Sequence, residues 1–236
     1  MFKSLSVGVL ALLLTACGAL KVRHAAPPKP EQSITRPGLP PGRFYRVDET
    51  QSELRILVYR AGPLARLGHN HVMVNRAISG AVSLADAAGE SAFWLNVPVA
   101  GFVVDDAAAS REEGAEFAGD ISDDAKSATL HNMLGAAVLD AEEFPVITVK
   151  SVAAAGAQNG SGAGALRATV AISVAGHVSK VDVPFTLHVD SRRLSATGSL
   201  ELRQSALGLT PFRLMLGALQ VEDAMTVKFQ IVAVPD

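Results

Sequence analysis

The sequence has little cysteine, few aromatic residues and almost no net charge. One cysteine in 236 residues excludes an intramolecular disulfide. A formal net charge of −2 supplies no basic face, so no nucleic-acid partner is predicted. Aromatic residues make up 5 % of the chain, while hydrophobic residues make up 49 %. Small aliphatic side chains fill a wide barrel poorly, so such an interior leaves room for a ligand.

Motifs of common enzyme classes are also missing. The sequence contains no H-E-x-x-H, no G-x-S-x-G and no Walker-type glycine loop. Two acidic pairs, Asp105 with Asp106 and Glu112 with Glu113, have the pattern of solvated helix surface. We therefore predict that the protein is not an enzyme and that it has no cofactor.

The N-terminal segment has the pattern of an export signal. Lys3 precedes an apolar run over residues 5–14, which is shorter than the roughly 20 residues that span a bilayer. The sole cysteine, Cys17, follows in the segment LTACG, which resembles the bacterial lipoprotein box. This resemblance implies cleavage before Cys17, a lipid anchor on its sulfur and, because Gly18 is not Asp, the periplasmic face of the outer membrane. The alternative is an ordinary signal peptide with a chance cysteine.

Prolines concentrate between this cysteine and the rest of the chain. Six of the twelve prolines lie within residues 21–41. Proline-rich linkers extend by about 3.1 Å per residue, so this segment can act as a spacer. We predict a signal peptide at 1–16, a lipidated, proline-rich tether at 17–42 and one folded domain at 43–236.

Alternating apolar and polar residues predict an all-β domain. The clearest case is the hairpin at 166–189, with a turn at 176–180 and an edge, strand start or bulge at Pro184. Further strands are predicted at 44–48, 53–60, 77–84, 91–104, 145–153, 194–203 and 221–234, and helices at 107–117 and 122–135. Residues 61–76 are predicted to be irregular and 156–164 to be a flexible connection. A closed antiparallel barrel of about eight strands removes exposed edges, and a two-sheet sandwich is the alternative.

Four segments in the same order are similar to YceI-like domains. They are YRVDETQSEL at 45–54, the stretch from His131 to EFPVITVKS at 143–151, GHVSKVDVP at 176–184 and QSALGL at 204–209. The resemblance implies a lipocalin-like barrel in the bacterial periplasm that holds polyisoprenoid or similar lipids in its bore. Two features depart from the family pattern. Gln204 and Ala206 replace charged residues, and GHNH at 68–71 is an addition.

Apolar strand residues are candidates for the wall of such a bore. We predict as ligand-binding wall residues Phe93, Leu95, Phe102, Val170, Ile172, Phe185, Leu187, Phe212, Met215 and Phe229. The alternative is that each belongs to an ordinary packed core. The segment 204–218 is unusually apolar for a loop, and we predict that it covers the mouth of the barrel.

Polar residues at the mouth are predicted to contact a ligand's head group. His69 and His71 are two positions apart, so on an extended segment both side chains point the same way. We predict His69, Asn70, His71 and His131 as polar ligand-binding residues. Loop structure and metal binding are the alternatives for His69 and His71, although a metal site normally needs three or four ligands.

These patterns together predict a lipid-binding protein of the bacterial periplasm. The predicted ligand is a long apolar amphiphile, such as an isoprenoid quinone or a polyprenyl phosphate, held for transport or storage. Each buried methylene contributes about 0.8 kcal/mol, so apolar walls alone could hold such a chain. The alternatives are a histidine- or metal-dependent enzyme at the mouth and a lipid-anchored interaction module with a packed core.

Overall fold

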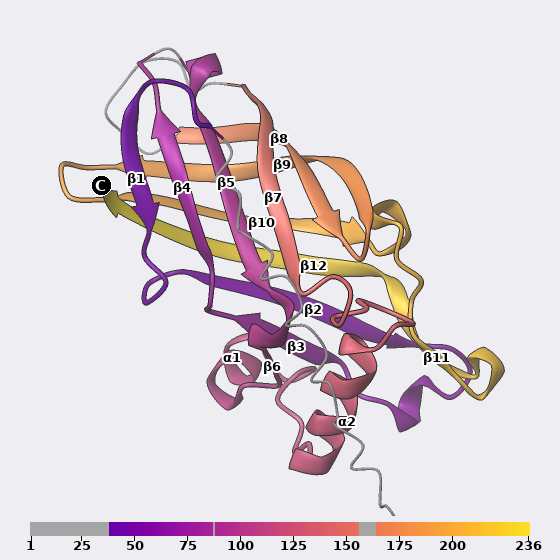
Figure 1. Ribbon diagram of the computed structural model, residues 1–236. Coiled ribbons are helices and arrows are strands. Elements are labelled where there is room, and N and C mark those ends of the chain that lie inside the picture. Colours follow the sequence, from indigo (N-terminus) through magenta and orange to yellow (C-terminus); the bar gives the residue numbers. More distant parts are fainter. Residues whose placement is uncertain (1–37, 87, 156–163) are drawn as a thin grey trace, which may run out of the picture. The chain divides into compact units, whose positions relative to one another are not determined.

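Antiparallel strands dominate the part of the chain that the structure describes. This part comprises residues 38–86, 88–155 and 164–236 of a computed structural model (Figure 1). The predicted signal peptide, Cys17, most of the tether and residues 156–163 of the predicted connection lie outside the described residues. Residues from Pro37 onward group into one unit.

The strands and helices are named as in Figure 1. The strands are β1 (Arg43–Val47), β2 (Glu53–Ala61), β3 (His71–Asn75), β4 (Ser79–Leu84), β5 (Ala92–Pro98), β6 (Phe102–Val104), β7 (Val146–Ala155), β8 (Gly164–Val174), β9 (His177–Val189), β10 (Leu194–Arg203), β11 (Arg213–Leu214) and β12 (Leu219–Pro235). The α-helices are α1 (Ala107–Glu112) and α2 (Asp123–Leu134). The 3₁₀ turns are η1 (Ala65–Leu67), η2 (Ala88–Glu90), η3 (Val99–Gly101), η4 (Ser205–Leu207) and η5 (Met215–Gly217).

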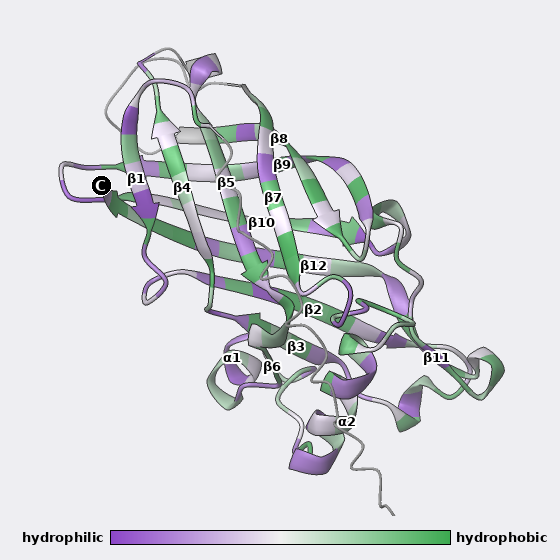
Figure 2. Cartoon of the chain, viewed as in Figure 1, coloured by the Kyte–Doolittle hydropathy of each residue, from purple (hydrophilic) through white to green (hydrophobic). Residues whose placement is uncertain are grey.

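Eight of these strands close into a barrel. The order is β1-β4-β5-β7-β8-β9-β10-β12, and β12 pairs with β1 to complete the ring. The edge of β12 that pairs with β1 is long enough to pair also with β2, and β3 and β6 continue the sheet from there. Hydrophilic and hydrophobic residues alternate along the strands (Figure 2). The predicted lipocalin-like antiparallel barrel is confirmed.

Both predicted helices are present, and one of them is shorter than predicted. For α2 the bounds agree with the sequence signals: the Ser122 hydroxyl accepts a hydrogen bond from the Ala125 N–H at 3.3 Å, and Gly135 follows the last turn. The other helix, α1, is shorter than predicted because Gly114 adopts a φ of +98°. The α2 side chains Leu130 and Met133 pack against the apolar interior, beside the β6 edge of the sheet.

The segment predicted to be irregular contains a strand. β3 has no alternating pattern because both of its faces are covered. Val72 and Val74 are fully buried under α1 on the outside of the barrel, while His71 and Met73 line its interior. The predicted strand at 91–104 is likewise wrong as a single unit, because the turn η3 separates β5 from β6 and sends β6 to pair with β3.

The hairpin predicted at 166–189 is confirmed, with a tighter turn than predicted. Strands β8 and β9 are joined by Ala175 and Gly176 alone, at φ values of +45° and +76°. The expectation of an edge near Pro184 is also met. β9 pairs with β10 only from Thr186 to Val189, so the ladder ends beside a residue that has no N–H to donate.

Candidate functional site

An apolar cavity of about 1100 Å³ occupies the inside of the barrel. Its lining reaches from Gln220, at one end of β12, to Ile231 near the other end. At about 3.4 Å per residue the lining extends for roughly 37 Å along this strand. The volume exceeds the 300–1,000 Å³ that is usual for sites of drug-sized molecules, so the cavity is suited to a larger ligand. The structure therefore contradicts the alternative of a fully packed core.

Nine of the ten predicted wall residues lie on this lining. They are Phe93, Leu95, Phe102, Val170, Ile172, Phe185, Leu187, Phe212 and Phe229. The prediction is wrong for the tenth, Met215, which lies on the turn η5, is 70 % exposed and is not part of the lining. Contact between these residues and a ligand remains a prediction.

Basic side chains gather at one end of the bore. The inward face of β2 presents Ile56 and Val58 and then ends in Arg60. His71 lies opposite Val58 in the β2–β3 ladder. His69 lies two residues earlier, in the segment that connects β2 to β3, and its ring centroid is 6.3 Å from that of His71. All three polar side chains line the cavity. We call Arg60, His69 and His71 the basic mouth.

A buried carboxylate orients one histidine of the basic mouth. Asp105 is 4 % exposed, and its Oδ2 lies 2.7 Å from Nδ1 of His71. Its Oδ1 accepts the backbone N–H of Val72 at 2.9 Å. An ionised Asp105 therefore keeps a proton on Nδ1 of His71, so Nε2 is the nitrogen available to a ligand. A protonated ring would donate a hydrogen bond there, and a neutral ring would accept one.

The other two predicted mouth residues do not line the cavity. The Asn70 side-chain oxygen accepts the backbone N–H of Arg60 at 3.0 Å, which joins the ends of β2 and β3. His131 is exposed on α2, and its carbonyl accepts the N–H of Gly135. Over residues 38–86, 88–155 and 164–236, no three His, Cys, Asp or Glu side chains are grouped so as to hold a metal ion.

Comparison with known proteins gives the family. Residues 45–233 match the model of the YceI-like domain. The chain belongs to the YceI-like family. The chain resembles the crystal structure of Burkholderia cenocepacia BcnA. The two share 19 % sequence identity with a TM-score of 0.58, and the match covers 80 % of this chain and 99 % of that one. A comparison with curated proteins found no match.

A second solved structure shares the YceI-like barrel. It is described as a polyisoprenoid binding domain from Saccharophagus degradans implicated in plant cell wall breakdown. The two chains are 11 % identical, with a TM-score of 0.54 and coverage of 81 % of this chain and 98 % of the other. At such identities both neighbours show the fold alone.

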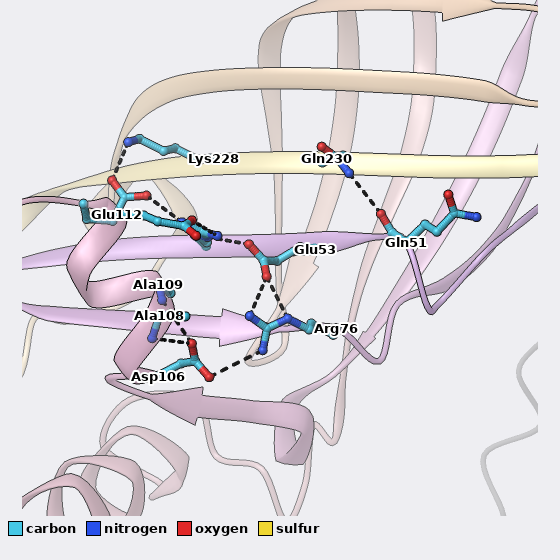
Figure 3. A network of polar contacts seen from close by, with 11 residues as sticks. Gln51, Glu53, Arg76, Asp106, Ala108, Ala109, Glu112, Lys228 and Gln230 are labelled. Atoms are coloured by element: carbon cyan, nitrogen blue, oxygen red, sulfur yellow. Dashed lines mark hydrogen bonds and ion pairs between the residues drawn. The ribbon is translucent and has the colours of Figure 1, made fainter.

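Two of the acidic residues that were predicted to lie on a solvated surface, Asp105 and Glu113, have buried side chains. Asp105 belongs to the basic mouth's support, and the Glu113 side chain is only 5 % exposed. On the outer face of β2 and β12, Glu113 pairs with both Arg55 and Lys228. Figure 3 shows the side chains of Glu53, Arg76 and Asp106 in the same network. Glu112 does not share this burial, because its side chain is 62 % exposed, although it too pairs with Arg55 at 2.7 Å. The network ties α1 to the outside of the YceI-like barrel, away from the bore.

The same network sets two ionisation states. Burial lowers the pKa of Arg55, but hydrogen bonds with Glu112 and Glu53 raise it by more, so this guanidinium stays charged. The backbone N–H of Ala109 and the charge of Arg76 hold the pKa of Asp106 below its ordinary value of 3.8. The stabilisation of α1 by Asp106 is therefore complete above that ordinary pKa and is lost as the pH falls through the lowered value.

Arg60 of the basic mouth and Asp105, which supports it, escaped sequence reasoning. Arg60 continues the inward parity of Ile56 and Val58, and this alternation was a usable signal. Asp105 had none, because its φ of +52° and its contact with His71 depend on how β3 and β6 pair.

None of the helices among the described residues is long and apolar enough to cross a membrane.

Proposed function

We propose that this protein binds a long-chain isoprenoid amphiphile, with the chain inside the barrel and the polar head at the basic mouth. The observation that carries the proposal is the cavity itself. It is apolar over most of its length, it reaches between the two ends of β12, and its lining turns basic at one end. The polyisoprenoid-binding domain of the same fold supports this class of ligand.

The walls supply enough driving force for such a ligand. Inward positions on all eight barrel strands except β1 contribute aliphatic or phenyl side chains, such as Leu95, Val170 and Phe229. A chain of about forty carbons that buries even half of those carbons gains on the order of 16 kcal/mol at about 0.8 kcal/mol per carbon. Ordering a flexible chain and losing its free motion consume much of this gain, which still leaves room for tight binding.

The basic mouth favours an anionic head group over a quinone ring. Arg60 carries a permanent positive charge, and its Nη1 donates to the Gly68 carbonyl at 2.7 Å, which holds the guanidinium at the mouth. The Asp105 carboxylate contacts Nδ1 of His71 and orients the ring, which leaves Nε2 for a hydrogen bond with a ligand. A phosphate accepts charge-assisted hydrogen bonds from Arg60 and can also form a hydrogen bond with Nε2 of His71, so a polyprenyl phosphate is the ligand of choice.

The proposed role is that of a tethered carrier or store rather than a catalyst. The lipoprotein-like segment around Cys17 and the proline-rich tether support an anchor on the periplasmic face of the outer membrane. Labelling cells with a radioactive fatty acid and fractionating their membranes tests that placement independently of ligand binding.

Native mass spectrometry of gently purified protein tests the ligand. We expect an added mass that matches an isoprenoid lipid, and we expect organic extraction to release that lipid. Added polyprenyl phosphate should then refill the emptied protein in preference to polyprenol of equal length. Protein that is always purified without lipid and binds neither added lipid would contradict the proposal. Equal binding of both lipids would contradict only the choice of head group.

A further inference from the structure

Exposed apolar side chains gather beside the basic mouth. Among the described residues, eight large hydrophobic side chains are classed as exposed, and four of them belong to η1 or to the β11–η5 hairpin. Leu214, Met215 and Leu216 are 46 %, 70 % and 109 % exposed, and Leu67 on η1 is 63 % exposed. We call these four residues the apolar tip.

The backbone holds the apolar tip in place. Met215 and Leu216 adopt φ values of +50° and +56°, a left-handed conformation that is unfavourable for residues with a side chain. The Leu64 N–H donates to the Ala218 carbonyl at 2.8 Å, which joins η1 to the hairpin. Figure 1 shows the β11 hairpin and the β2–β3 connection at the same end of the barrel. The exposed leucines thus belong to a built projection.

The apolar tip is continuous with the bore. Leu67 and Leu214 line the cavity and are also exposed to solvent, so the cavity reaches the surface between them. An apolar chain that enters here from an apolar phase never has to cross water.

Charge on the two segments that carry the apolar tip has one sign. Residues 61–71 and 205–221 include Arg66, Arg213 and two histidines but no Asp or Glu. Both arginines are exposed. Basic side chains that flank exposed leucine and methionine are the pattern of a surface that enters an anionic bilayer.

We propose that the apolar tip docks into the surface of an anionic lipid bilayer and brings the mouth of the bore into contact with the acyl region. The surface chemistry selects this occupant. A lipid bilayer matches both the apolar side chains and the flanking positive charge, and it is where an amphiphile that fits the bore resides. The purpose of docking rests on the proposed function, but docking itself does not require a ligand in the bore.

Fluorescence quenching by brominated lipid tests the docking. The chain has one tryptophan, Trp94, which is 7 % exposed, so a second tryptophan at the tip reports its own surroundings. The full-length L216W variant is mixed with phosphatidylethanolamine–phosphatidylglycerol vesicles that carry brominated acyl chains. R192W, in the exposed β9–β10 turn, serves as the matched control with the same N-terminal segment.

We expect at least a twofold loss of L216W emission in brominated vesicles compared with unbrominated ones. R192W should change no more than the unmodified chain, and zwitterionic vesicles should reduce the effect on L216W. Equal quenching of the two variants, or none, would overturn the proposal. An L216W emission shift that depends on protein concentration and not on vesicles would also overturn it, in favour of a second copy as the occupant. Empty protein should dock as well as loaded protein, so failure to bind isoprenoid leaves this test intact.

Discussion

Replacing Ala196 by tryptophan is expected to empty the bore while the barrel stays folded. Ala196 lines the cavity from near the start of β10, opposite Leu187 on β9 and Ile231 on β12. An indole group there projects into the space that we assign to the ligand chain. Displacing about four methylenes costs about 3 kcal/mol, or roughly a 200-fold loss of affinity. The fraction of lipid-loaded protein by native mass spectrometry measures the effect.

The neighbouring residue provides the control. Thr197 is exposed on the opposite face of β10, so T197W adds the same side chain outside the barrel. We expect T197W to keep its lipid and both variants to keep the thermal unfolding midpoint within a few degrees. If A196W and T197W retain lipid equally, the ligand does not occupy the bore.

Replacing Asp105 by leucine is expected to cause the largest loss of stability. The substitution leaves the buried N–H of Val72 without its acceptor, which costs about 1–3 kcal/mol. It also places a leucine at a φ of +52°, which costs about 1–2 kcal/mol more. We expect a loss of about 3–4 kcal/mol in the free energy of unfolding, measured by urea denaturation.

An asparagine at the same position separates folding from head-group binding. Asn tolerates the left-handed backbone, and its side-chain oxygen still accepts from Val72, so D105N should lose less than about 1 kcal/mol. Its amide nitrogen cannot accept the Nδ1–H of His71, so the ring loses the contact that orients it. We therefore expect about tenfold weaker binding of polyprenyl phosphate and unchanged binding of polyprenol. Equal weakening for both lipids would show that Asp105 acts on the fold and not on the head group.

Much of the fold could be predicted because its signals are local. In β8, β9 and β10 one face points to the interior and the other to solvent, so alternation of apolar and polar residues marks each strand. Ser122 and Gly135 mark the ends of α2 by capping chemistry that needs no tertiary contact. The wall of the bore follows from the same parity, and for this reason Phe93, Val170 and Phe229 could be placed on it from sequence.

The remaining features depend on contacts between distant segments. β3 was missed because α1 covers its outer face, so Val72 and Val74 break the alternation. Asp105 reads as a surface residue until β6 brings it against β3. Met215 shares the apolar character of the wall, but its left-handed backbone turns it outward. Composition alone could not distinguish a side chain inside the barrel from one at its tip.

Binding of isoprenyl phosphates of increasing length tests the central claim most directly. If the chain lies inside the bore, each added five-carbon unit buries more apolar surface. We therefore expect affinity, measured by titration of lipid-free protein, to rise at least about tenfold per unit until the bore is full and then to level off. An affinity that does not depend on chain length would contradict the account, because binding would then reside in the head group alone.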